Sequence, residues 1–367
     1  MNRGKQTWPH RSFKLTGFGE PLREQHDQIG APAGKQVLLR VLACGVCHSD
    51  LHLSDGFFDL GGGKRMDLGR GIALPRTLGH EIAGEVVAVG EQVTGLAIGD
   101  RRLLYPWIGC GDCGLCSAGA EHLCPQPRHH GTTVDGGFSN FVMVPDARYL
   151  LAFDPLPESF AATLACSGLT AYSALCKAGA KSASDPLLII GAGGVGLAAI
   201  SIACALSGVG PVVAEIDGDK REGALAAGAS EVVDPRDPDV KRRLMKHTGG
   251  GFAAAVDFVG ATATVALGMN LLRKGGRLVV VGLYGGSMEF SLPTLPLRSV
   301  SLMGSYVGSL KELEELMALA RDLKLNPMQI VPRTLGSTQA VLEDLRAGRI
   351  RGRAVIIPSV TDSKDVS

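Results

Sequence analysis

The second half of the chain alternates short apolar runs with segments of helical spacing, and this alternation constrains the fold most strongly. Five apolar runs follow residue 160, at 186–190, 210–217, 229–235, 253–260 and 276–283. Strands that alternate with helices in this way form a parallel sheet covered by helices on both faces. We therefore expect a doubly wound α/β unit over residues 167–305.

The first 166 residues predict a different architecture. QVLLRVLA at 36–43 and EIAGEVVAV at 81–89 have the composition of strands, and the later apolar runs are short and separated by glycine. This pattern favours a compact β-barrel-like domain. Residues 54–79, which are rich in glycine and charge, predict a long loop. A helical pattern at 310–322 and a strand pattern at 352–358 can return to this first domain.

Composition narrows the class of partner. The 37 lysines and arginines balance 36 aspartates and glutamates, so no basic field for nucleic acid exists and we expect a small-molecule partner. The N-terminus lacks the apolar core of a signal peptide, and no uninterrupted apolar run approaches the roughly 20 residues of a membrane span. We therefore expect a cytoplasmic protein without a membrane partner. Clustering among the 9 cysteines favours metal sites over disulfides.

One cysteine cluster has the spacing of a closed metal site. Cys110, Cys113, Cys116 and Cys124 form a C-x2-C-x2-C-x7-C run. Four thiolates at this spacing can surround one zinc tetrahedrally, and glycines between them permit the sharp turns. An iron–sulfur cluster is the alternative, since ferredoxin-like spacing is similar. Four protein ligands leave no open position, so we expect a structural zinc.

A glycine-rich turn follows the apolar run at 186–190. Its G-x-G-x-x-G pattern consists of Gly191, Gly193 and Gly196, with Gly194 and Val195 inside it, and a helical pattern follows. Such glycines let the backbone approach a pyrophosphate at a helix N-terminus, where free N–H groups favour anions. The motif predicts a dinucleotide site.

An acidic residue at the end of the next apolar run favours NAD. Glu215 lies 24 residues after Gly191, close to the spacing of a carboxylate that binds the adenosine ribose diol. A carboxylate there would repel the 2′-phosphate of NADP. Asp217 is the alternative ribose ligand. Lys220 and Arg221 are near enough to leave NADP open.

A second group of metal-ligand residues is dispersed along the chain. CGVCHSDLH at 44–52 offers Cys47, LGHE at 78–81 offers His80, and LACSGLT at 164–170 offers Cys166 next to the predicted nucleotide unit. Two thiolates and one imidazole leave one zinc position open for substrate or water.

Together these motifs resemble those of zinc-dependent alcohol dehydrogenases of the medium-chain dehydrogenase/reductase superfamily. The likeness runs from CGVCHSD and GHE through the four-cysteine run, ACSGLTAY and GAGGVG to GRAV at 352–355, nearly the whole chain. It implies a GroES-like β-barrel catalytic domain over 1–166 with a return segment at 306–367, and a Rossmann NAD-binding domain over 167–305. It also implies NAD, two zinc ions per subunit, and a homo-oligomer, with a tetramer favoured over a dimer.

The resemblance assigns the catalytic roles. It makes Cys47, His80 and Cys166 the catalytic-zinc ligands, and Glu81 an occasional substitute ligand. Ser49 would take the alcohol proton and pass it through the cofactor ribose to His52. Asp50 would accept the other N–H of His80 and fix the orientation of its ring.

The resemblance also assigns cofactor contacts. His48 and Arg353 would contact the pyrophosphate, and Thr170 would pack on the nicotinamide. Val281 and Gly282 would belong to the same binding site.

The chain departs from the family between Cys47 and His80, which are 33 residues apart, more than the resemblance leads us to expect. The extra residues are either a tolerated surface insertion, since longer loops cost little, or a wall at the substrate entrance. In the second case Phe57 and Phe58 would face Trp107 across a hydrophobic pocket suited to bulky alcohols.

The expected activity is the reversible, zinc-dependent oxidation of a primary or secondary alcohol to an aldehyde or ketone, with hydride transfer to NAD. A polyol dehydrogenase is an alternative that Cys166 argues against, because such enzymes usually have glutamate there. Glu215 disfavours an NADPH-preferring aldehyde reductase. A non-catalytic zinc- and NAD-binding module is the alternative from another class.

The remaining cysteines and a histidine pair predict structural positions. Cys44, Cys176 and Cys204 lie in apolar runs and are expected in the core. His129 and His130 follow the four-cysteine run and are expected to be polar loop residues.

Overall fold

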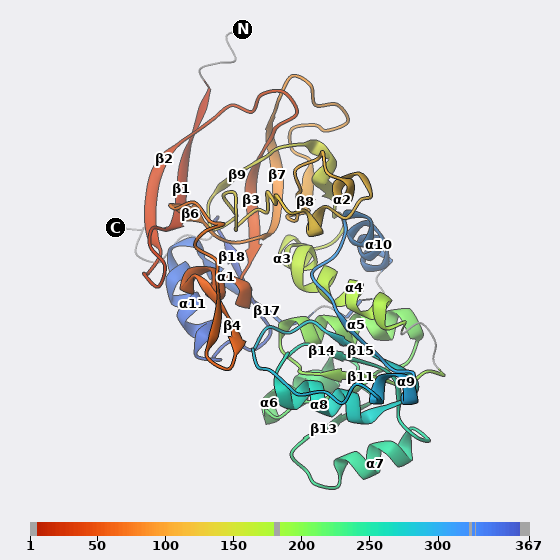
Figure 1. Cartoon of the computed structure of the whole chain (residues 1–367). Coiled ribbons are helices and arrows are strands. Elements are labelled where there is room, and N and C mark those ends of the chain that lie inside the picture. Colours follow the sequence, from red (N-terminus) through yellow and green to blue (C-terminus); the bar gives the residue numbers. More distant parts are fainter. Residues whose placement is uncertain (1–5, 180–183, 323–324, 327, 360–367) are drawn as a thin grey trace.

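The computed structural model describes residues 6–179, 184–322, 325–326 and 328–359. The chain builds two sheet systems, and the helical segment that begins at α3 runs between them (Figure 1). The described strands are β1 (Thr7–Leu15), β2 (Arg23–Gly30), β3 (Val37–Gly45), β4 (Phe57–Gly61), β5 (Lys64–Asp67), β6 (Arg76–Thr77), β7 (Glu81–Val89), β8 (Arg101–Leu104), β9 (Phe141–Val144), β10 (Leu150–Ala152), β11 (Leu187–Ile190), β12 (Val212–Ala214), β13 (Glu231–Val233), β14 (Phe252–Asp257), β15 (Leu272–Val280), β16 (Ser301–Gly304), β17 (Ile330–Thr334) and β18 (Arg353–Ile357). The described helices are α1 (His48–Asp55), α2 (Gly114–Ser117), α3 (Glu158–Thr163), α4 (Leu169–Ala178), α5 (Gly194–Ser207), α6 (Gly218–Ala226), α7 (Val240–His247), α8 (Thr262–Leu271), α9 (Thr294–Arg298), α10 (Leu310–Arg321) and α11 (Thr338–Arg346).

The first sheet system confirms the predicted all-β body. A seven-stranded sheet has β3 near its centre, paired with β7, β9 and β18, and a three-stranded sheet of β2, β1 and β6 lies beside it. The strand β3 is buried at seven of its nine positions, because its apolar residues face the protein on both sides. The C-terminal strand β18 pairs with β3, so the end of the chain returns to this sheet.

The register of this sheet brings distant parts of the sequence together. The antiparallel pairing of β3 with β7 sets Gly45 opposite Glu81, and the pairing of β3 with β18 sets Gly45 opposite Val355. The end of β3, the start of β7 and the start of β18 therefore meet at one point.

The second sheet confirms the predicted doubly wound unit. Its six strands are all parallel, in the order β13-β12-β11-β14-β15-β16. Successive strands are added on one side of β11 up to β13 and on its other side from β14 onward, and ligands of such sheets bind at the carboxyl ends of the strands at this switch point.

The helical segment between the sheets is interrupted by a π-helical turn, η4 (Leu164–Gly168), between α3 and α4. The whole segment, Glu158–Ala178, is long and apolar enough to cross a membrane, but 89% of its apolar window is buried inside the protein. Its apolar residues therefore pack in the protein core. π-turns inside helices often mark functional sites.

One local prediction was wrong. The predicted loop at 54–79 contains the end of α1 and a hairpin of β4 and β5, which turns through three glycines with positive φ at 61–63. Three consecutive glycines allow a tight turn that other residues would strain. His129 and His130 lie in a loop outside the named helices and strands, as predicted, and both are buried, at 5% and 2% exposure. The predicted core positions of the remaining cysteines agree with the structure, because Cys44 is fully buried and Cys176 and Cys204 pack against the core.

Candidate active site

Three predicted metal ligands meet where the two sheet systems adjoin. Sγ of Cys47, a ring nitrogen of His80 and Sγ of Cys166 all lie within 4.8 Å of one another, and all three side chains are buried. Cys47 follows β3 by two residues and His80 precedes β7 by one, so the pairing of these strands brings the two together. Cys166 reaches them from the π-helical turn. Two sulfurs and one nitrogen are a donor set that suits zinc with one open position.

Asp50 holds the first two ligands. Its Oδ2 accepts the backbone N–H of Cys47 at 2.8 Å, which fixes the start of α1, and its Oδ1 lies 3.4 Å from Nδ1 of His80. Both ring nitrogens of His80 are buried without a hydrogen-bond partner among the described residues. A metal at one nitrogen and a closer contact with Asp50 at the other would satisfy both, so the residues fit the predicted zinc.

The carboxylate of Glu81 is bound to other protein groups. Nε of Arg353 donates to its Oε2 at 3.0 Å, and Nη2 of Arg353 donates to its Oε1. The backbone N–H of Ser167, next to Cys166, also donates to Oε1 at 3.0 Å. Gly45 leaves the room for this carboxylate, because a Cβ there would lie 1.9 Å from Oε2. The metal-ligand group contains Cys47, His80 and Cys166 but not Glu81, whose role as a substitute ligand stays a prediction.

The ion pair of Glu81 and Arg353 is fully buried, with side-chain exposures of 0% and 5%. Burial raises the pKa of Glu81, and the charge of Arg353 acts in the opposite direction. Burial disfavours the charge of Arg353 as well, but the charges of Glu81 and Cys47 outweigh it and raise the pKa of Arg353. The guanidinium thus stabilises negative charge on both the carboxylate and the first thiolate.

Ser49 and His52 lie three residues apart on α1, so they share one face of that helix. Oγ of Ser49 is 3.7 Å from Sγ of Cys47. The His52 ring is half-buried against Phe58, with ring centroids 4.9 Å apart, and burial lowers its pKa. The helix thus leads from the metal ligands to a partly exposed imidazole.

The glycine-rich turn lies at the carboxyl end of β11. Gly191 has φ of +91°, and a Cβ on Gly196 would lie 2.0 Å from the carbonyl oxygen of Gly191, so both positions require glycine. A Cβ on Gly193 would meet no protein atom, which leaves its backbone open to a ligand. Nη1 of Arg353 lies 3.1 Å from the position of a Cβ on Gly194, at the start of α5. One arginine therefore contacts Glu81 and also faces the predicted pyrophosphate position.

The other predicted cofactor residues lie around this turn with different exposures. The N–H groups of Val281 and Gly282 both donate to the carbonyl of Asp257 at the end of β14. Thr170 is buried on α4, whereas His48 is exposed at the start of α1.

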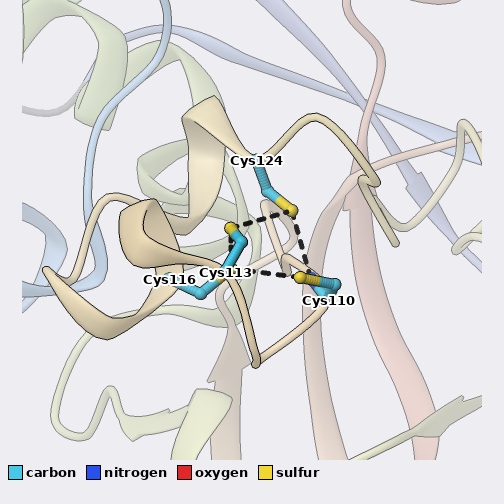
Figure 2. A group of neighbouring side chains, drawn as sticks. All are labelled: Cys110, Cys113, Cys116 and Cys124. Carbon is cyan, nitrogen blue, oxygen red and sulfur yellow. Dashed lines mark hydrogen bonds between the residues drawn. The ribbon is translucent and has the colours of Figure 1, made fainter.

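The four cysteines of the second cluster converge in a lobe around α2 (Figure 2). The three sulfur–sulfur distances are 3.9 Å from Cys110 to Cys116, 3.5 Å from Cys113 to Cys116, and 3.8 Å from Cys113 to Cys124. Zinc–sulfur bonds of about 2.3 Å in a regular tetrahedron place the sulfurs about 3.8 Å apart. The arrangement fits a four-thiolate zinc site.

The chain matches known proteins over nearly its full length. Family models match residues 33–155, as an alcohol dehydrogenase GroES-like domain, and residues 194–322, as a zinc-binding dehydrogenase. An NAD-dependent alcohol dehydrogenase from Sulfurisphaera tokodaii is 37% identical over 350 residues, which cover 95% of this chain and 100% of that relative. This chain belongs to the zinc-dependent alcohol dehydrogenase family.

Solved structures of the family agree with this assignment. The alcohol dehydrogenase from Aeropyrum pernix aligns with a TM-score of 0.83 at 34% identity, covering 95% of this chain and 100% of that one. The D-arabinose dehydrogenase from Sulfolobus solfataricus aligns with a TM-score of 0.81 at 29% identity, covering 96% of this chain and 100% of that one. The predicted family and fold class are therefore confirmed.

In this alcohol dehydrogenase, Glu215 is bound to the glycine-rich turn. Its Oε2 accepts the N–H of Ala192 at 2.7 Å, and its Oε1 accepts the N–H of Asp217 at 3.0 Å. Asp217 itself accepts the N–H of Lys220 and caps α6, so it has a structural partner. The guanidinium of Arg221 donates to the carbonyls of Glu215 and Ile216 and pairs with Asp234 at 3.2 Å.

The predicted pocket residues are not equally close to the metal ligands. The ring of Trp107 lies 5.2 Å from that of His80, and its Nε1 donates to the carbonyl of Ala165, beside Cys166. Phe58 contacts His52, whereas Phe57 stacks beneath the guanidinium of Arg65 at 4.0 Å. Tyr306, whose ring lies 6.1 Å from that of Trp107, was not predicted at this site, and His129 was predicted only as a polar loop residue. No local pattern could have found either one, because each approaches Trp107 from a distant segment.

We predict that the two metal groups differ in what they support. Cys47→Ser should lower kcat/KM by at least about 100-fold with little change in melting temperature, because it removes a ligand of the open group. Cys113→Ser should lower the melting temperature first, because a closed zinc site contributes folding free energy. Turnover, zinc content and thermal unfolding would be measured for both variants. Equal thermal losses would contradict this division of roles.

We also predict that Arg353→Met destabilises the fold by about 3–5 kcal/mol, because it leaves Glu81 buried and unpaired. Arg351→Met is the matched control, since Arg351 is 76% exposed and pairs with the exposed Asp219. The free energy of unfolding in urea would be measured for both, with and without zinc. A loss no larger for Arg353→Met than for the control would contradict the proposed role of the buried pair.

Proposed function

We propose that this enzyme reversibly oxidises a primary or secondary alcohol to an aldehyde or ketone with NAD, and that each subunit holds one catalytic and one structural zinc. The convergence of Cys47, His80 and Cys166 beside the glycine-rich turn carries this proposal. An open metal position next to Ser49 and His52 also argues against a non-catalytic binding module, which needs no proton route.

The chain's own residues would position the reactants and move the proton. Bound zinc would supply a Lewis acid that makes an alcohol hydroxyl acidic, and bound NAD would supply the hydride acceptor. Ser49 would accept the hydroxyl proton beside Cys47, and His52 would release it at the surface, with the cofactor ribose between them. The buried Arg353 would face the pyrophosphate, and Thr170 and Val281 would lie against the nicotinamide. The buried walls around Trp107 would exclude water.

NAD is the preferred cofactor in this proposal. The buried Glu215 places a carboxylate beside the turn, where it would repel a 2′-phosphate. Arg221 would bind that phosphate only weakly, because its guanidinium already donates to the carbonyls of Glu215 and Ile216 and pairs with Asp234. Glu215 is therefore the proposed ribose ligand in preference to Asp217.

The proposed substrates are bulky and mainly hydrophobic alcohols. Trp107 lies beside His80, and Phe58 covers His52 from the hairpin of β4 and β5. That hairpin reaches the nucleotide-binding unit, because a Cβ on Gly61 would lie 2.5 Å from the backbone of Gly286. A polyol substrate is the second candidate, and the likeness to a D-arabinose dehydrogenase favours it.

We further propose a cytoplasmic homo-oligomer, with a tetramer favoured. The strand β16 is at the edge of the six-stranded sheet. Large apolar side chains near it are exposed, among them Tyr284 at 78%, Leu292 at 73% and Leu297 at 76%. Exposed apolar patches beside a free sheet edge are typical of subunit interfaces.

The proposed activity predicts NAD-linked oxidation across a panel of short aliphatic, branched, allylic and benzylic alcohols by the zinc-replete protein. Formation of reduced nicotinamide would be followed with NAD and with NADP. We expect the largest kcat/KM for the bulky alcohols, and loss of turnover on metal chelation. No turnover of any alcohol by protein shown to bind zinc and NAD would overturn the proposal.

A second prediction concerns the ribose site. Glu215→Ala should weaken the binding of NAD much more than the binding of NADP. The substitution removes the hydrogen bonds to the ribose of NAD, and it also removes the repulsion of the 2′-phosphate of NADP. Dissociation constants for both cofactors would be measured, with Asp217→Ala as the matched control. If the ratio of the NAD and NADP dissociation constants is unchanged in Glu215→Ala but altered in Asp217→Ala, the ribose ligand is Asp217 instead.

A further inference from the structure

A buried polar nitrogen without a partner lies on the wall beside the metal ligands. Nε2 of His129 has no hydrogen-bond partner in the described part of the chain, and the side chain is only 5% exposed. A buried polar group without a hydrogen bond costs about 1–3 kcal/mol. Neither the metal group nor the proposed proton route uses this nitrogen.

The backbone fixes His129 opposite Trp107. The N–H of Arg128 donates to the carbonyl of Ile108 at 2.7 Å, and that of His130 donates to the carbonyl of Pro106 at 3.0 Å, so the two segments run side by side. The carbonyl of His129 accepts the N–H groups of a tight turn at 132–134. The imidazole therefore has a defined position.

The Trp107 ring lies close to two imidazoles. Its centroid is 5.2 Å from that of His80 and 5.3 Å from that of His129, with the His129 ring nearly perpendicular to the indole. The same indole thus adjoins the predicted metal ligand His80 and the imidazole that carries the unpaired nitrogen. A substrate that binds at the metal group and extends along Trp107 would approach His129 with its far end.

The chemistry of this nitrogen specifies the group that it can bind. Burial lowers the pKa of His129 to about 4, so the ring is neutral near pH 7. A neutral imidazole nitrogen either donates or accepts, depending on the tautomer. A hydroxyl can do both, whereas a charged group would be costly to bury there.

We propose that His129 is a specificity-determining residue that binds a second, uncharged hydroxyl at the far end of the alcohol substrate. This proposal rests on the proposed function and deepens it: the substrate is an extended, mostly apolar alcohol with one distal hydroxyl. Binding pockets commonly combine apolar walls with a few placed polar groups.

The test compares diols with matched simple alcohols. Each α,ω-diol with three to eight carbons is paired with the primary alcohol in which a methyl group replaces the distal hydroxyl. In a purely apolar site the methyl compound should have the higher kcat/KM at every chain length, since each buried methylene contributes about 0.8 kcal/mol. We expect the zinc-replete wild type to prefer the diol by about 5- to 50-fold in kcat/KM at one or two chain lengths.

Variants test whether His129 causes this preference. His129→Phe should abolish it while leaving kcat/KM for the simple alcohols unchanged or raised, and His129→Gln should retain part of it. His10→Phe is the matched control, because His10 is also buried with an unpartnered Nε2 but lies on β1 in the outer three-stranded sheet. Thermal unfolding and zinc content would establish that all variants are folded.

The outcomes separate this proposal from the proposed function. The role of His129 would be overturned if both members of every pair are oxidised without a preference for the diol. It would also be overturned if His129→Phe leaves such a preference unchanged. In both cases the proposed alcohol dehydrogenase activity would still stand. If neither member is oxidised, the proposed function fails, and dissociation constants from calorimetry on the zinc- and NAD-loaded protein decide the role of His129. Diol-selective binding that His129→Phe removes would support it, and equal binding within all pairs would overturn it.

Discussion

The buried ion pair of Glu81 and Arg353 is the interaction on which the rest of the site depends. Glu81 follows His80 directly and accepts the N–H of Ser167, the residue after Cys166, so one carboxylate positions the segments of two metal ligands. Arg353 begins the last strand and also reaches the start of α5. Because both charges are buried, each requires the other, and the pair joins β7 to β18 within the seven-stranded sheet while Glu81 also binds the π-helical turn.

Electrostatics within this cluster are consistent with metal chemistry. Two cysteine sulfurs and a carboxylate lie close together in a buried region, where the repulsion among their ionised forms would be large without a compensating charge. Arg353 supplies part of that charge: hydrogen bonding to Cys166 lowers the pKa of Cys47 first, and Arg353 lowers it further. A divalent cation on Cys47, His80 and Cys166 would supply the rest.

The wall opposite these ligands combines apolar and polar features. Trp107 lies close to both the proposed metal ligand His80 and the buried His129. The hairpin of β4 and β5 places Phe58 against His52, and its glycine turn touches the backbone of Gly286 in the nucleotide-binding unit. The proposed pocket residues therefore come from a hairpin and from loops, whereas the proposed metal ligands come from strand ends and from the π-helical turn.

Local pattern determined much of this protein. The strands at 36–43 and 81–89, the parallel sheet, the glycine-rich turn and the close spacing of the four cysteines follow from periodicity and from motifs within short segments. The partner of Arg353, 272 residues away in the sequence, was decided only by strand register. Tertiary packing likewise buried His129 and set it against Trp107. Such contacts depend on which segments adjoin in space, and no periodicity within a single segment records that.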